Sequence, residues 1–237
     1  MFINYAHRGA SAYAPENTLY SFYLALWQGA NGIETDVRKT KDDVLVLFHD
    51  STLDRVTAGS GRLADYTYDQ LLELQVIGGK DNSICDRIVR LEDFLRHLMF
   101  RDLAFAIEFK QANIEMDTVD MLERFDASAK VTLTSFDFQN IRTAKRYCPK
   151  YRVGYLTSVV DDNVFQMMRE IKGEEICPNA STLTKDMVER CHQLGFSVRA
   201  WGVSDETLMA KVYGLGVDGM TVNFPDLLRK HIQRPRS

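Results

Sequence analysis

Short apolar runs alternate with amphipathic stretches along nearly the whole chain, a pattern typical of parallel strands joined by helices. Strands are predicted at Ile3–His7, Ile33–Val37, Leu103–Phe109, Lys130–Thr134, Tyr151–Tyr155, Glu175–Pro178, Phe196–Ala200 and Val217–Val222. Helices are predicted at Pro15–Gln28, Leu91–Phe100, Asn113–Phe125, Asp137–Tyr147, Asp161–Glu170, Thr184–Gln193, Ser204–Tyr213 and Pro225–Ile232. Eight such pairs in 237 residues favour a TIM (β/α)8 barrel over an open doubly wound sheet.

One insertion interrupts this rhythm after the second strand unit, which an extended run at Val44–His49 completes. It spans Asp50 to about Arg90 and contains a turn at Ala58–Gly61 and a helical pattern at Tyr68–Leu74. Long insertions in barrels are commonly functional loops on the catalytic face. We expect a single catalytic domain over 1–237, with 50–90 as a small cap or lid. Residues 71–77 would form an amphipathic helix on the barrel or, alternatively, a membrane-facing surface.

Composition narrows the functional classes. The net charge of −4 argues against a nucleic-acid-binding protein, which usually carries a basic face. The four cysteines include no Cys-x-x-Cys pair, so no disulfide framework is indicated and a reducing compartment is expected. The first residues lack a basic leader, and no apolar run approaches the roughly 20 residues of a membrane span. We expect a cytoplasmic protein without stable membrane association.

Charged side chains end the predicted strands at positions where a sheet would otherwise bury apolar groups. Alternation places Glu34 and Asp36 on one face of their strand, and Glu108 with Lys110 on one face of another. At the carboxyl end of barrel strands, such pairs are typical of catalytic sites. Three converging carboxylates would repel one another unless a cation joins them. Ligands that are all oxygens suit Mg²⁺ or Ca²⁺ better than Zn²⁺.

Two histidines and two cations accompany these carboxylates. His7 and His49 each end an extended run, and together they fit a general acid and base working near neutral pH. Arg8 offers a planar donor fork suited to phosphate, and Lys110 offers a point charge. The set indicates an anionic, phosphate-type substrate. A glycosidase would need two carboxylates, not three.

These motifs resemble those of the glycerophosphodiester phosphodiesterases, and the resemblance extends over nearly the whole chain. It is carried by His7–Gly9, Pro15–Thr18, Glu34–Val37, His49–Arg55 and Glu108–Lys110 in this order and spacing. Weaker similarity is found at Ser135–Phe136, Trp201, Gly216–Gly219 and Asn223–Asp226.

The resemblance implies a TIM barrel that hydrolyses glycerophosphodiesters to glycerol 3-phosphate and an alcohol, in glycerol and lipid metabolism. It implies metal ligands at Glu34, Asp36 and Glu108, an acid/base pair at His7 and His49, phosphate-binding groups at Arg8 and Lys110, and supporting residues at Glu16 and Asn17, next to a helix N-terminus. Trp201 and Phe136 would form an apolar wall for the glycerol or the leaving group, although Trp201 also fits a plain core position.

Three functions remain open at this point. The first is metal-dependent hydrolysis of small diesters, the second is phospholipase or lysophospholipase-D-like action on lipids, and the third is binding without catalysis on the same barrel. The residues do not decide between Mg²⁺ and Ca²⁺, between a water and a substrate hydroxyl as nucleophile, or which histidine is the acid. The preferred head group and the oligomeric state are also open.

Overall fold

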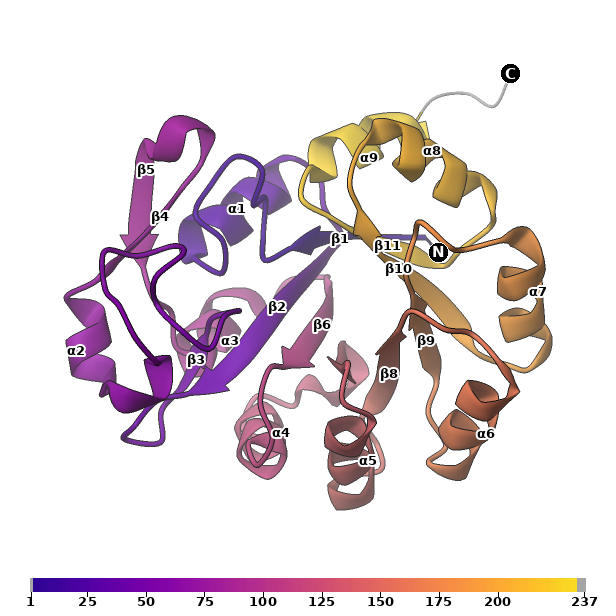
Figure 1. Cartoon of the computed structure of the whole chain (residues 1–237), viewed down its shortest axis with the longest axis horizontal. Coiled ribbons are helices and arrows are strands. Elements are labelled where there is room, and N and C mark those ends of the chain that lie inside the picture. The colour runs from indigo at the N-terminus through magenta and orange to yellow at the C-terminus, as the bar shows by residue number, and fades with distance from the viewer. Residues whose placement is uncertain (1, 234–237) are drawn as a thin grey trace.

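The computed structural model describes residues 2–233, apart from the side chain of Asp81; the ends of the predicted domain, residue 1 and 234–237, lie outside this range. Parallel strands form a ring around a central axis (Figure 1). They are β1 (Ile3–His7), β2 (Gly32–Lys39), β6 (Ala104–Phe109), β7 (Val131–Ser135), β8 (Arg152–Thr157), β9 (Glu175–Pro178), β10 (Ser197–Val203) and β11 (Gly219–Val222). Because β1 pairs with both β2 and β11, the ring is closed. The predicted TIM barrel is confirmed.

Helices surround the ring, with one after each barrel strand. They are α1 (Leu19–Trp27), α3 (Leu91–Leu98), α4 (Glu115–Glu123), α5 (Phe138–Tyr147), α6 (Asp162–Glu170), α7 (Lys185–Gln193), α8 (Glu206–Gly214) and α9 (Pro225–Gln233). Several begin at a capping side chain, as α6 does where Asp161 accepts from the backbone N–H of Val164. The main core lies between the strands and these helices.

The first helix begins later than predicted. The sequence predicts Pro15–Gln28, whereas α1 begins at Leu19, because Thr18 and Ser21 form a capping box at its N-terminus. The preceding turn includes Asn17 at φ 57°, a left-handed conformation that a helix cannot include. Glu16 and Asn17 therefore lie in the loop before the helix.

Strand alternation separates the apolar core from the barrel mouth. Ile33 and Val37 of β2 and Ile107 of β6 are fully buried on the helix side, as predicted. Glu34 and Asp36 alternate with them and point into the barrel.

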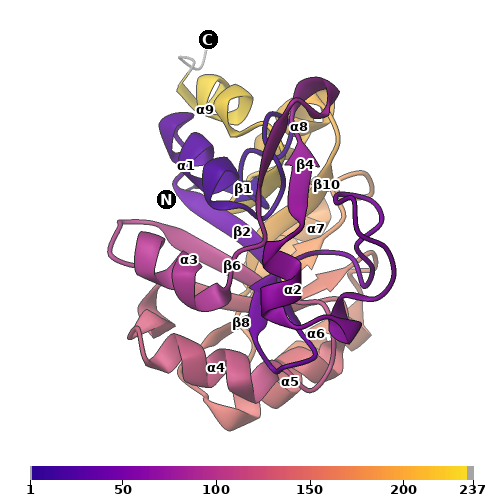
Figure 2. The ribbon, with the colours of Figure 1, turned by 90° about the vertical axis from the view of Figure 1, so that its left-hand side faces the viewer.

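The insertion is a small packed unit beside the barrel (Figure 2). It follows β3 (Leu45–Leu47), which pairs antiparallel with β2, and contains α2 (Tyr68–Leu72), β4 (Gln75–Gly78) and β5 (Ile84–Arg87), with the short 3₁₀ turns η1 (Leu63–Asp65) and η2 (Lys80–Asn82). The predicted helix through residues 71–77 is wrong. Helix α2 ends at Leu72, and residues 75–78 pair with 84–87 as an antiparallel hairpin that buries Val76.

This unit has its own apolar cluster. Val46 and Phe48, at the edge of the barrel sheet, pack with a set of buried residues of the insertion: Leu53, Leu63, Leu71, Val76 and Ile88. The hairpin also contacts the first helix, because Asp86 Oδ2 accepts from the backbone N–H of Tyr20 over 3.0 Å. Within residues 2–233, no helix combines the length and the apolar character needed to cross a bilayer.

Candidate active site

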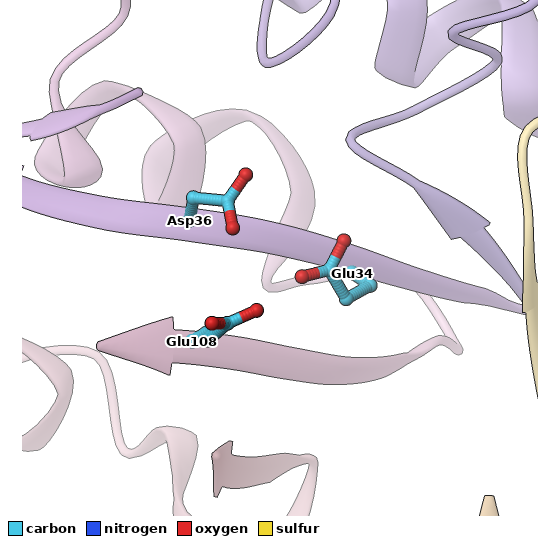
Figure 3. Close-up of side chains that lie close together, drawn as sticks. All are labelled: Glu34, Asp36 and Glu108. Carbon is cyan, nitrogen blue, oxygen red and sulfur yellow. The ribbon is translucent and has the colours of Figure 1, made fainter. Parts of the chain in front are cut away.

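Three buried carboxylates converge inside the mouth of the barrel (Figure 3). Glu34 and Asp36 extend from β2, and Glu108 extends from β6, where it lies in register with Asp36. At most 6% of any of these residues is exposed. One ligand oxygen from each lies within 4.8 Å of the others. The structure therefore brings together the three residues that the sequence predicts as metal ligands.

The electrostatics of this trio fit a divalent cation. Burial, followed by the charges of Asp36 and Glu108, raises the pKa of Glu34 to about 8. Burial and the charge of Asp36 likewise raise the pKa of Glu108 to about 7. Burial opposes ionisation of Asp36 as well, but the charges of Arg8 and Lys110 outweigh it and hold its pKa below its usual range. Because these three carboxylates do not all ionise together without a compensating charge, they form a suitable site for a divalent cation.

An orphaned oxygen supports the same conclusion. Oδ1 of Asp36 is buried and has no hydrogen-bond partner within the described residues. Lys110 Nζ lies 3.4 Å from it but makes its close contact with Glu108 Oε1, at 2.6 Å. A buried carboxylate oxygen without a partner is costly, and a bound cation would satisfy it.

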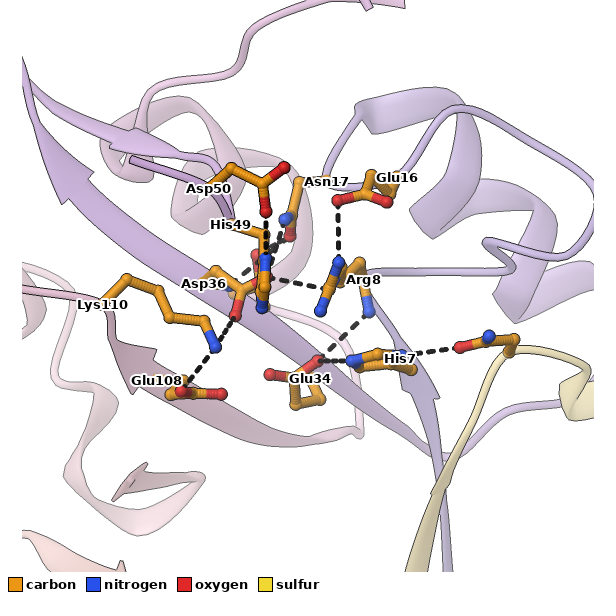
Figure 4. A network of polar contacts seen from close by, with 12 residues as sticks. His7, Arg8, Glu16, Asn17, Glu34, Asp36, His49, Asp50, Glu108 and Lys110 are labelled. Carbon is orange, nitrogen blue, oxygen red and sulfur yellow. Dashed lines mark hydrogen bonds and ion pairs between the residues drawn. The ribbon is translucent and has the colours of Figure 1, made fainter. Parts of the chain in front are cut away.

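Asn17 holds the Asp36 carboxylate through a side-chain hydrogen bond. Its amide nitrogen donates to Oδ2 of Asp36 over 2.9 Å, while its carbonyl oxygen accepts from the Thr35 hydroxyl over 2.7 Å (Figure 4). The backbone N–H of Asn17 donates to the carbonyl of Arg8 over 2.9 Å. Asn17 therefore contacts a carboxylate of the trio directly.

Both histidines lie at the mouth, each held through Nδ1. His7 Nδ1 is 2.6 Å from Asn223 Oδ1, and His49 Nδ1 is 2.5 Å from Asp50 Oδ1. About a third of each imidazole is exposed, 32% for His7 and 31% for His49. Desolvation and the charge of Arg8 lower the pKa of His7 to about 4. Desolvation also lowers the pKa of His49. Because Nδ1 of each ring has a hydrogen-bond partner, Nε2 is the ring nitrogen available for proton transfer.

Arg8 links two parts of the site. Its Nη1 donates to Glu16 Oε1 over 2.9 Å, and its Nε lies 3.1 Å from Asp36 Oδ2. Arg8 adopts φ 56°, which turns its side chain from the end of β1 toward the carboxylates. A residue other than glycine rarely adopts this conformation, and such strain is typical of functional sites.

A cavity of about 450 Å³ opens above these groups. His7, Arg8, Glu34, His49, Glu108 and Lys110 line its polar side, and Phe136, Leu156, Trp201 and Val203 line its apolar side. The rings of Phe136 and Trp201 meet edge to face, with centroids 4.9 Å apart. Trp201 is half-buried and donates from Nε1 to the carbonyl of Cys177 over 3.0 Å. It is a wall residue, not a plain core residue.

The insertion contributes no residue from 51–90 to this wall in the described part of the chain. The insertion begins at the mouth, after His49, but packs beside the barrel. The structure therefore does not show the expected lid over the cavity.

Three residues of the site were not predicted. Asn223 contacts His7, Asp50 contacts His49, and Arg55 joins Asp50 to Glu16. Asp50 and Arg55 lie within the motif that begins at His49, and Asn223 follows the last strand directly. The motif after His49 and the end of the last strand were the available signals.

Comparison with known proteins assigns the chain to a family. The model of the glycerophosphoryl diester phosphodiesterase family matches residues 7–227. The chain is 30% identical over 236 residues to a glycerophosphodiester phosphodiesterase of Bacillus altitudinis, covering 94% of both chains. It is 29% identical over 229 residues to a glycerophosphodiester phosphodiesterase of Caldanaerobacter subterraneus, again covering 94% of both.

A solved structure agrees with these sequence matches. It is a phosphodiesterase of Oleispira antarctica in complex with the product sn-glycerol 3-phosphate, with a TM-score of 0.88 and 26% identity. The alignment covers 97% of this chain and 96% of that one. Together with the family match over residues 7–227, this confirms the resemblance seen in the motifs: the chain belongs to the glycerophosphoryl diester phosphodiesterase family.

Proposed function

We propose that this protein hydrolyses glycerophosphodiesters to glycerol 3-phosphate and an alcohol, with a divalent cation, Mg²⁺ or Ca²⁺, held by Glu34, Asp36 and Glu108. The observation that carries the proposal is the convergence of these carboxylates within 4.8 Å, beside a cavity that is lined by two of them and by Arg8 and Lys110. Its membership of the family and the product complex of the Oleispira relative support the choice of substrate.

The chain's own residues would bind and orient the diester. When bound, the cation supplies a Lewis acid beside the phosphoryl group. Arg8 presents a planar fork and Lys110 a point charge, and both suit phosphoryl oxygens. Because Arg8 is fixed by Glu16 and Asp36, its guanidinium is held in place before the substrate arrives.

The two histidines would move the protons. One would accept a proton from the attacking oxygen, and the other would donate a proton to the departing alcohol. Their Nε2 atoms are suited to this, because Asn223 and Asp50 occupy the Nδ1 atoms. The attacking oxygen belongs either to water or to the neighbouring hydroxyl of the substrate. A cyclic glycerol phosphate early in the time course would assign the hydroxyl.

The apolar wall would receive the glycerol or the leaving group. Phe136 and Trp201 face the cavity, and Lys110 Nζ lies 5.7 Å from the Phe136 ring centre. Exposed apolar groups at this face, Phe136 at 46% and Val159 at 57%, favour lysophospholipase-D-like action on lipids as the second candidate. Binding without catalysis is the weaker alternative, because all three carboxylates and both histidines are present.

The remaining assignments concern the whole chain. We propose that it acts as a single catalytic domain, with 50–90 as a cap beside the mouth. Its partner would be a small phosphodiester, not nucleic acid, and it would not associate stably with membranes. The four free cysteines support a reducing, cytoplasmic compartment.

A panel assay tests the proposal. Release of glycerol 3-phosphate is measured from glycerophosphocholine, glycerophosphoethanolamine and glycerophosphoglycerol, and release of lysophosphatidic acid is measured from a lysophospholipid, each with Mg²⁺ or Ca²⁺. We expect release from the water-soluble diesters. Cleavage of the lysophospholipid alone would favour the second candidate, and no cleavage of any diester would contradict the proposed function.

A further inference from the structure

Arg55 of the insertion joins two carboxylates that each hold a different group of the candidate active site. Its Nε donates to Asp50 Oδ2 over 2.6 Å. Its Nη1 and Nη2 donate to the two oxygens of Glu16, over 2.8 and 2.7 Å. All three nitrogens are therefore engaged, and the plane of the guanidinium is fixed between the loop after β1 and the residues after β3. Such a bidentate pairing adds geometric specificity to charge attraction.

One side of this bridge leads to His49. The second oxygen of Asp50 pairs with His49 Nδ1 over 2.5 Å, while Arg38 Nε donates to the His49 carbonyl over 2.9 Å. A carboxylate on Nδ1 fixes both the tautomer and the rotation of an imidazole. Without Arg55, Asp50 would lose the group that fixes its own orientation.

The other side leads to Arg8. Glu16 Oε1 accepts from Arg8 Nη1 over 2.9 Å as well as from Arg55 Nη2 over 2.7 Å. The Glu16 carboxylate, whose side chain is 15% exposed, therefore lies between two guanidinium groups. Arg55 fixes the carboxylate, and the carboxylate fixes the position of Arg8 at the cavity.

We propose that Arg55 is a positioning residue, which orients His49 through Asp50 and Arg8 through Glu16. The inference rests on the roles proposed above for His49 and Arg8. Arg55 does not line the cavity, and its side chain is 46% exposed. It is therefore not placed to contact a substrate in the cavity. Because partly exposed ion pairs add little stability, its removal should affect turnover and binding more than folding.

The two sides of the bridge predict different kinetic effects. Asp50→Asn should lower kcat by about 10- to 100-fold with a small change in KM, in the range seen when a supporting partner is lost. Glu16→Gln should raise KM and weaken the binding of glycerol 3-phosphate, measured by calorimetry. Arg55→Met should produce both effects. Arg62→Met is the matched control, because Arg62 is an exposed arginine of the same insertion that forms no ion pair among the described residues.

A double variant shows whether Arg55 acts through His49. In the His49→Ala background, Arg55→Met should leave kcat unchanged and still weaken glycerol 3-phosphate binding. Arg55→Lys, which keeps the charge but loses the fork, should be intermediate, and it replaces Arg55→Met if that variant does not fold. Wild-type kcat and affinity in Arg55→Met, or a full additional loss of kcat in the double variant, would overturn the inference. A wild-type rate in His49→Ala would remove His49 from the proposed mechanism, whereas a wild-type protein that cleaves no diester would contradict the proposed function itself.

Discussion

The side-chain amide of Asn17 donates to Oδ2 of Asp36 over 2.9 Å, from a residue at φ 57°. The loop after β1 thus holds the most deeply buried carboxylate of the trio in position for a cation. Partners of this kind commonly set the orientation and basicity of a metal ligand.

Loss of the Asn17 amide should weaken metal binding. We expect Asn17→Gly to lower the affinity for Mg²⁺ or Ca²⁺ by about 10- to 100-fold, because glycine accepts the left-handed backbone but leaves Asp36 without its donor. Asn17→Ala should lose the same affinity and also be less stable. Calorimetric titration of metal into the metal-free variants measures the two affinities, and urea unfolding measures the difference in stability. Wild-type affinity in Asn17→Gly would show that the amide does not orient Asp36.

Each histidine should be needed for turnover. His7→Ala and His49→Ala should each lower kcat by about 10²- to 10⁴-fold, the range for loss of an acid or base. If the two act as a unit, the double variant should lose far less than the product of the single losses. Steady-state kinetics on one diester at saturating metal measures this. A near-wild-type rate for either single variant would remove that residue from the mechanism.

The metal-free protein should become less stable as pH rises from about 6.5 to 8, because below this window the lowered pKa values of His7 and His49 oppose the effect of Glu34. Glu34 has a folded-state pKa of about 8, above its ordinary value of 4.5. In this window the folded state keeps a proton that the unfolded chain releases, so the free energy of unfolding falls with pH. In urea unfolding of the metal-free protein, the free energy of unfolding of Glu34→Gln should fall less steeply with pH than that of the wild type. Glu189→Gln, at an exposed position, should follow the wild type. Equal slopes for all three proteins would contradict this.

The insertion should matter for stability more than for substrate choice. Replacing Thr57–Lys80 with a Gly/Ser linker would remove Leu63, Leu71 and Val76 from the cluster that covers Val46 and Phe48. A milder change, Leu71→Ala, should cost about 2–5 kcal/mol of unfolding free energy without altering the preference among glycerophosphodiesters. Leu74→Ala, at a partly exposed position, should cost less. A changed preference in a folded Leu71→Ala variant would support the lid that the sequence suggested.

Much of the site could be predicted because its residues follow local periodicity. Glu34, Asp36 and Glu108 alternate with fully buried apolar residues, so their direction follows from strand geometry and their meeting follows from a closed barrel. The contact between His7 and Asn223 joins residues 216 positions apart. No local pattern encodes such a pairing, and the same holds for Arg55 and Glu16.

The errors also have physical causes. The segment 71–77 is mostly apolar and suits a helix or a strand, and pairing with residues 84–87 makes its second half a strand. The sequence predicts too early a start for α1 because Pro is a common first residue of a helix, whereas Thr18 and Ser21 provide the actual cap.

The central claim is that Glu34, Asp36 and Glu108 hold a divalent cation needed to release glycerol 3-phosphate from a glycerophosphodiester. The most direct measurement is glycerol 3-phosphate release by chelated protein before and after Mg²⁺ or Ca²⁺ is restored, with folded Asp36→Asn as the control. We expect no release without metal, full recovery in the wild type, and little recovery in Asp36→Asn at the same metal concentration. Full activity in thoroughly chelated wild-type protein would contradict the account.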